Sequence, residues 1–102
     1  MSLAFSQKDP DEIIVLSIGF ANVLNVGETI TACAFTAIDN DTRGDVSARM
    51  ISGLADISST PVVKQTVRAG INGHTYLIKA KVTTSAGRVL VGSGVLPVVT
   101  GA

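Results

Sequence analysis

The sequence predicts an all-β fold in which two antiparallel sheets pack face to face as a sandwich. Short segments rich in valine, isoleucine and alanine recur about every ten residues, and no long helical pattern separates them. The clearest strand covers residues 76–83, where one face collects apolar side chains, namely Tyr76, Ile78, Ala80 and Val82. A chain of 102 residues suits one sandwich of about seven strands.

The only tyrosine stands where a loop passes into this strand. Gly70 and Gly73 lie in that loop, and glycines tolerate the positive φ angles of tight turns. A tyrosine in this position indicates a tyrosine corner, in which a buried ring directs its hydroxyl to the upstream backbone. Because the device marks immunoglobulin-like sandwiches, we predict an immunoglobulin-like antiparallel β-sandwich with structural roles for Tyr76, Gly70 and Gly73.

The chain divides into an arm and one domain. Residues 1–12 carry a charged run that Pro10 interrupts, so we expect a flexible N-terminal arm. Residues 13–102 are expected to form a single immunoglobulin-like domain. No apolar run approaches the roughly 20 residues of a membrane helix. The acidic residues and proline near the start do not suit a signal peptide.

Two strands are expected in the first third of the domain. Residues 13–18 are a short apolar run, and residues 28–38 form a longer strand with apolar side chains on both faces. The second strand contains the only cysteine, Cys33, which excludes an internal disulfide and is expected to be a small buried hydrophobic residue. Residues 19–27 are expected to be irregular, with room for one helical turn over 21–24.

The middle third contains one ambiguous segment. Residues 46–57 place apolar side chains at helical spacing, and Asp45 is a suitable helix cap. Against a helix, Gly53 interrupts the segment and β-branched residues surround it. We therefore predict a strand over 48–52, a turn near Gly53 and a short extended piece over 55–58.

The remaining strands are predicted at 62–69, with Val63 and Val67 inward, and at 88–99 after a turn over 85–87. Several apolar residues then fall on faces opposite the predicted core: Val62, Leu77, Val89, Val91 and Val95. A contiguous patch of such residues would mark an interface. A bulge at Gly92 or Gly94 is the alternative, because it would reverse the alternation partway along the strand.

Charge and hydropathy exclude several classes of partner. Eight basic residues balance eight acidic ones, so no net charge attracts nucleic acid or a membrane headgroup. Basic and aromatic residues are not interleaved as a nucleic-acid surface requires. A chain with no net charge and a positive mean hydropathy is poorly suited to stay monomeric, so we expect a homo-oligomer.

No group of residues has the pattern of a catalytic site. His74 is the only histidine, and it lies in the loop before Tyr76, where we expect it to be solvated. One histidine and one cysteine supply too few ligands for zinc. We therefore predict no enzymatic activity, no catalytic, cofactor-binding or metal-binding residue, and no small-molecule substrate.

The polar loop over residues 39–45 leaves one alternative open. Its aspartates have the spacing of a calcium loop, but Arg43 and Met50 stand where ligands are required, so an EF-hand is excluded. The alternative to a solvated loop is a looser cation site that uses Asp39, Asp41 and Asp45.

Four segments resemble, in their order and spacing, the proteins of a known family. They are residues 8–12 before an apolar strand, 27–30 opening the next strand, 70–76, and 83–88 before a strand ending at 96–98. On these segments the chain resembles small β-sandwich proteins of tailed bacteriophages, described as tail-fibre adaptor or virion-associated proteins. Phe20 and Phe35 stand where such proteins often have tryptophan. That family is regarded as structural, so the resemblance implies no catalytic residue.

The resemblance implies a non-enzymatic virion protein, made in the cytoplasm of the bacterial host. It would assemble with other virion proteins at a tail, a head–tail joint or a capsid surface, by burying apolar sheet surface and adding strands at open edges. Residues 1–12 would order on assembly. The alternative is a carbohydrate-binding or host-surface-binding module, which the lack of tryptophan disfavours.

Overall fold

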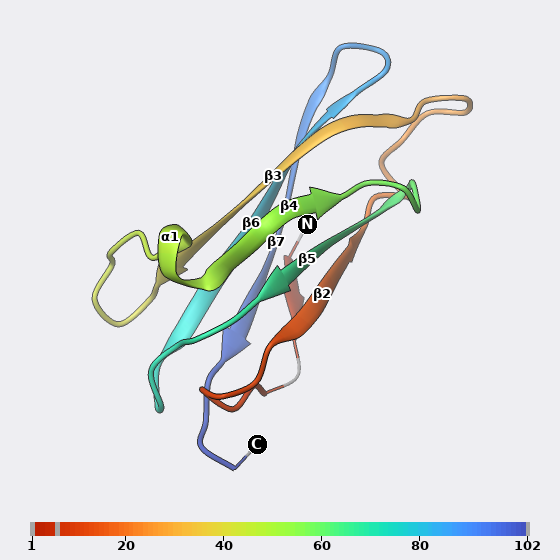
Figure 1. The fold of residues 1–102 in the computed structure, drawn as a ribbon. Helices are drawn as coiled ribbons and strands as arrows, with labels where there is room; N and C mark the ends of the chain where they lie inside the picture. Colours follow the sequence, from red (N-terminus) through yellow and green to blue (C-terminus); the bar gives the residue numbers. More distant parts are fainter. Residues whose placement is uncertain (1, 6, 102) are drawn as a thin grey trace.

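The computed structural model describes residues 2–5 and 7–101, the first three of them by their backbone alone. In this part of the chain, seven strands form two sheets, and one short helix precedes a strand of the smaller sheet. The molecule is elongated, with extents of 42 × 23 × 22 Å. Figure 1 shows the longer strands passing behind the shorter sheet and extending beyond it. The predicted all-β sandwich is confirmed.

The larger sheet has the strand order β1-β7-β6-β3. Its members are β1 (Ser2–Ala4), β3 (Ile30–Asp39), β6 (Thr75–Thr84) and β7 (Val89–Pro97). Strand β1 pairs with β7 in parallel, and the other pairs are antiparallel. The smaller sheet has the order β2-β5-β4, with antiparallel pairs.

The members of the smaller sheet are β2 (Ile14–Gly19), β4 (Ile51–Asp56) and β5 (Val62–Val67). The order β2-β5-β4 facing β7-β6-β3 agrees with the B-E-D and G-F-C order of immunoglobulin domains. The immunoglobulin-like assignment itself stays a prediction.

The prediction for residues 48–52 is partly wrong. A single helical turn, α1 (Ser47–Met50), precedes β4. The Asp45 carboxylate accepts a hydrogen bond from the Ser47 amide at 2.9 Å, which favours the turn because this donor has no partner within the helix. The turn directs Met50 into the core, where its side chain is 1% exposed. Gly53 has a φ of +73° inside β4, at a place where the pairing with β5 is irregular.

The core lies between the two sheets and is built from the inward side chains of each strand. Those predicted from alternation, Tyr76, Ile78, Ala80 and Val82, are buried, and so are Val63 and Val67. In β3, the core face is the one that carries Phe35 and Ala37. Cys33 is half-buried in β3, and burial raises the pKa of its thiol to about 11.

The alternation of β7 continues without a bulge. Its pairing with β6 runs unbroken from Val89 to Pro97, so the alternative of a reversal at Gly92 or Gly94 is wrong. Both glycines face inward and leave space for phenylalanine rings. A Cβ at Gly92 would lie 2.9 Å from Phe20, and one at Gly94 would lie 2.5 Å from Phe5.

The N-terminal segment continues the pairing of β1 along the edge of β7 that faces away from β6. The amides of Phe5 and Lys8 donate to the carbonyls of Val95 and Pro97, and Lys8 accepts from the amide of Val99. The Lys8 side chain is fully buried, and its ammonium donates to the carbonyls of Asp9 and Ala69 at 2.8 and 2.7 Å. The flexibility of residues 1–12 as an arm stays a prediction.

Candidate functional site

Tyr76 connects the start of β6 to the loop before it. Its ring is 1% exposed, and the Ile71 amide donates a hydrogen bond to its hydroxyl oxygen at 2.8 Å. Gly70 and Gly73 have φ angles of +102° and +86° in this loop. A Cβ at Gly70 would lie 2.8 Å from the Val98 side chain, so both space and conformation favour glycine there.

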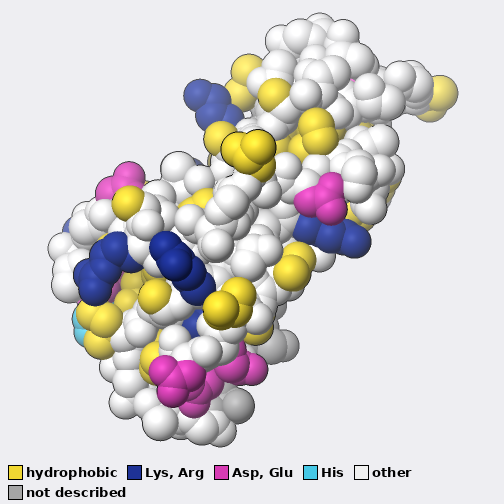
Figure 2. Space-filling model, in the orientation of Figure 1, with side chains coloured by type: hydrophobic (Ala, Val, Ile, Leu, Met, Phe, Trp, Pro, Cys, Tyr) yellow, Lys and Arg dark blue, Asp and Glu magenta, His cyan; other side chains and the backbone are white. Residues whose placement is uncertain are grey.

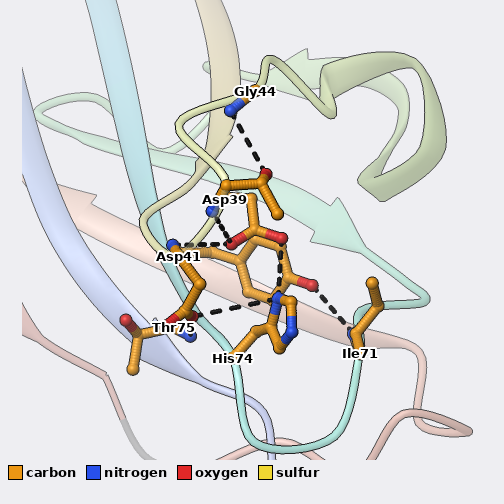
Figure 3. A network of polar contacts seen from close by, with 8 residues as sticks. Asp39, Asp41, Gly44, Ile71, His74 and Thr75 are labelled. Carbon is orange, nitrogen blue, oxygen red and sulfur yellow. Dashed lines mark hydrogen bonds and ion pairs between the residues drawn. The ribbon is translucent and has the colours of Figure 1, made fainter.

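A polar network lies beside this corner, where the loop after β3 meets the loop before β6 (Figure 3). His74 Nδ1 lies 2.8 Å from Asp39 Oδ2, and Asp41 accepts a hydrogen bond from the Thr75 amide at 3.0 Å. The other Asp39 oxygen accepts from the amides of Asp41 and Thr42. The network therefore fastens the two loops together.

The prediction that His74 is solvated is wrong, because its side chain is 25% exposed and binds a carboxylate that is 3% exposed. Burial opposes ionisation of Asp39. Hydrogen bonds from His74 and from two backbone amides outweigh burial, so the pKa of Asp39 lies below its ordinary value. No local sequence pattern indicates this contact, since the partners are 35 residues apart.

Asp39, Asp41 and His74 offer ligand atoms that lie within 4.8 Å of one another, near enough to share a cation. Asp45, the third aspartate of the looser cation site, instead binds Ser47. Both oxygens of Asp39 already accept hydrogen bonds. As arranged, the three side chains hold two loops together.

A cavity of about 180 Å³ opens next to the network. Apolar side chains form much of its lining, with Asp39 and Arg49 as the charged residues. Among the lining residues, no nucleophile is paired with a base, which a hydrolytic or transfer reaction would require.

At the opposite end of the molecule, an ion pair between Glu28 and Arg88 connects the segment before β3 to the turn before β7. The Glu28 carboxylate is 3% exposed, and it binds the Arg88 guanidinium and the Thr84 hydroxyl. Arg88 also donates to the Val23 carbonyl at 2.9 Å. Hydrogen bonds from Arg88, from the Asn25 amide and from Thr84 lower the pKa of Glu28 to about 2.

The outer face of the larger sheet carries exposed valines and two lysines. We call Lys79, Lys81, Val89, Val91 and Val95 the lysine face. The valines are 54%, 48% and 36% exposed, in sequence order. Lys79 lies between Thr36 and Ser93 in the cross-strand register, and Lys81 lies between Ala34 and Val91. The outward positions of Val89, Val91 and Val95 agree with the sequence prediction.

A second exposed set lies just before β2 and in its first residues, next to the smaller sheet. We call Asp11, Glu12, Ile13 and Val15 the acidic segment. Ile13 and Val15 are 71% and 59% exposed, and both carboxylates are exposed. Figure 2 shows acidic side chains gathered at the end of the molecule near the C-terminus, with hydrophobic side chains in separate places over the face that it displays.

Comparison with known proteins gives one family. The model of the family described as "Podophage GP4 fiber-tail adaptor protein gp77" matches residues 8–97. No curated protein matches the chain. Within the described residues, the short helix α1 is far from the length that a membrane crossing needs.

Proposed function

This chain belongs to the podophage GP4 fiber-tail adaptor family, and from that premise we propose that it is a non-enzymatic virion subunit that joins fibre proteins to the tail. The family match over residues 8–97 carries the proposal. An adaptor needs surfaces for two neighbours rather than a cleft for a substrate. The following features of the chain support that role.

Exposed apolar side chains occur on both layers of the sandwich. The lysine face belongs to the larger sheet, and the acidic segment adjoins the smaller sheet, where Leu54 is also 97% exposed. Scattered exposed apolar residues are ordinary on protein surfaces, but groups on opposite layers allow a subunit to contact two neighbours at once. Burial of these side chains would supply the free energy of assembly.

Open strand edges offer a second mode of contact. In the described part of the chain, β3 ends one sheet, and β2 and β4 end the other. An edge strand presents unpaired backbone groups to which a strand from a neighbouring protein can add. Residues 2–5 and Lys8 pair along the fourth edge. We expect residues 1–12 to rearrange or become further ordered when the subunit joins its neighbours.

The proposal is tested on virions of the phage that encodes this chain. Mass spectrometry of gradient-purified virions is expected to detect the protein at several copies per particle. Gold-labelled antibodies raised against it should bind at the tail, between the fibres and the tail body. Antibody absorbed with purified protein serves as the control. A protein that is made during infection but is missing from washed virions would contradict the proposal.

A further inference from the structure

We propose that copies of this chain associate head to tail, with the acidic segment of one copy docking on the lysine face of the next. The inference deepens the proposed function, on which it rests, by naming a second copy of the chain as one of the two neighbours.

The lysine face has an unbalanced charge. Lys79 and Lys81 are the only charged side chains at the outward positions of β3, β6 and β7 in the described chain. No ion pair or side-chain hydrogen bond engages either lysine within that part of the chain. Lys79 and Lys81 are two residues apart on one face of β6, beside exposed Val89 and Val91 of β7. Their ammonium groups repel each other unless carboxylates approach.

The acidic segment carries the opposite charge beside a similar apolar surface. The Asp11 carboxylate is exposed and has no hydrogen bond or ion pair within the described residues. Glu12 uses one oxygen to accept from the Asp9 amide at 2.7 Å, so its other oxygen is available. Ile13 and Val15 follow on the exposed side of the chain. Carboxylates next to exposed apolar side chains therefore match lysines next to exposed valines.

The formal charges of the two surfaces also correspond. The charges of Asp9, Asp11 and Glu12 act on the buried Lys8, and the sum of the four formal charges leaves two negative charges in this region. The lysine face carries two positive charges. An association that pairs them opposes each charge of one surface with a charge of the other. Complementary potentials of this kind determine orientation and exclude wrong partners.

The two surfaces belong to different layers, so one copy can use both at once. Figure 1 shows β2 in the front layer and β6 and β7 behind it. A contact between two different surfaces is heterologous, and its repetition produces a closed ring or an open filament. In either arrangement, the surface that neither contact covers would be repeated on every copy. This repetition would increase the avidity of the assembly for fibre proteins.

The test is sedimentation velocity of the purified chain over a range of concentrations. We expect the wild type to form oligomers whose association constant falls as salt rises from about 0.1 M to 1 M, because the screening length shrinks from about 10 to 3 Å. Lys79→Glu with Lys81→Glu, and separately Asp11→Lys with Glu12→Lys, should each reduce the association constant about tenfold or more. Circular dichroism confirms that each variant is folded.

Mixing the two double variants tests directly whether the two surfaces bind each other. An equimolar mixture of these two double variants should recover oligomers larger than a pair, because each contact again joins opposite charges. Arg43→Glu with Arg68→Glu is the matched control, since it changes the net charge equally at cations outside the lysine face. This control alone should stay within about threefold of the wild type. Mixed with the Asp11→Lys, Glu12→Lys variant, it should form no larger oligomers than it forms alone, because that variant keeps only its lysine face and can only end a chain.

Three outcomes would overturn the inference. They are a wild type that stays monomeric at millimolar concentration and low salt, an association that neither double variant weakens, and a control that weakens it as much as the lysine variants do. A monomeric chain found at the tail would overturn head-to-tail association and leave the adaptor role intact. A chain that oligomerises as described but is missing from virions would contradict the adaptor role alone.

Discussion

The Ile71 amide donates a hydrogen bond to the Tyr76 hydroxyl oxygen, five residues further along the chain, at 2.8 Å. The bond closes the loop that leads into β6, and the Tyr76 ring lies between the sheets with 1% of its surface exposed. One side chain therefore contacts both the core and the loop. His74, in the same loop, contacts Asp39 and connects this corner to the end of β3.

Tyr76→Phe tests the bond separately from the ring. Phenylalanine fills the same space but leaves the Ile71 amide without its acceptor, so we expect a loss of about 1–2 kcal/mol in the free energy of unfolding. Urea denaturation followed by circular dichroism measures it. Thr36→Val is the control, because it removes a hydroxyl from an exposed position of β3 and should change stability by less than about 0.5 kcal/mol. Equal effects of the two substitutions would contradict a structural role for the hydroxyl.

Glu28 predicts a loss of stability in acid. Its pKa falls from an ordinary value of 4.5 to about 2 in the folded chain. A carboxyl with a depressed folded pKa stabilises fully above its unfolded pKa and loses that stabilisation as pH falls through its folded pKa. The contribution should therefore decline between about pH 4.5 and 2. Urea midpoints measured over this range should fall for the wild type.

Glu28→Gln provides the comparison for this titration. The variant should be less stable than the wild type at pH 7, because the amide cannot form the ion pair with Arg88. The difference between the two proteins should narrow as the pH drops, since protonation removes the same charge from the wild type. A constant difference from pH 7 to 2 would show that Glu28 does not titrate as described.

The two inward glycines of β7 should respond differently to an added methyl group. At Gly92 the new Cβ would meet Phe20 and Ile18 at 2.9 and 3.0 Å, and both side chains are fully buried. Neither can move aside without disturbing the core. Gly92→Ala should therefore cost about 1–3 kcal/mol of global stability.

At Gly94 the obstacle is the Phe5 ring, at 2.5 Å, which belongs to the N-terminal segment. Gly94→Ala should displace that segment from β7, with a smaller global effect. Hydrogen exchange should quicken at the amide of Phe5, which donates to the Val95 carbonyl. Gly19→Ala is the control, because a Cβ there meets nothing within 4 Å. Equal global losses at Gly92 and Gly94, with unchanged exchange at Phe5, would contradict this account.

Much of the fold could be predicted because burial leaves a period of two in the sequence. Val63, Val67 and the inward residues of β6 were predicted from that period, and the valines of β7 were placed outward by the same argument. The helical turn before β4 could not be recognised, because four residues are too few to show a period. The site depends on contacts between distant residues, such as His74 with Asp39, and local patterns carry no record of these.

Gln65, a polar residue that is 2% exposed, lies beside the irregular pairing of β4 with β5. Its side-chain amide donates to the carbonyls of Ser52 and Thr66 at 2.8 and 3.1 Å, and it lies 3.3 Å from the Gly53 carbonyl. Without the Gln65 amide, these carbonyls would lose a hydrogen-bond donor where the pairing of β4 with β5 is interrupted. Gln65→Met keeps the length of the side chain but removes the donor, so we expect a loss of about 1–3 kcal/mol in urea denaturation.

Gln65→Glu separates the donor from the space that the side chain fills. At pH 7 the introduced carboxylate would face carbonyl oxygens in a buried position, so this variant should be less stable than Gln65→Met. Burial and the carbonyls would raise the folded pKa of that carboxyl above its unfolded value of about 4.3. The stability that Gln65→Glu lacks relative to Gln65→Met should therefore decrease as pH falls through the folded pKa of the carboxyl, because the protonated group can again donate. If Gln65→Glu kept the same deficit relative to Gln65→Met at every pH, donation to these carbonyls would not be what holds β4 in place.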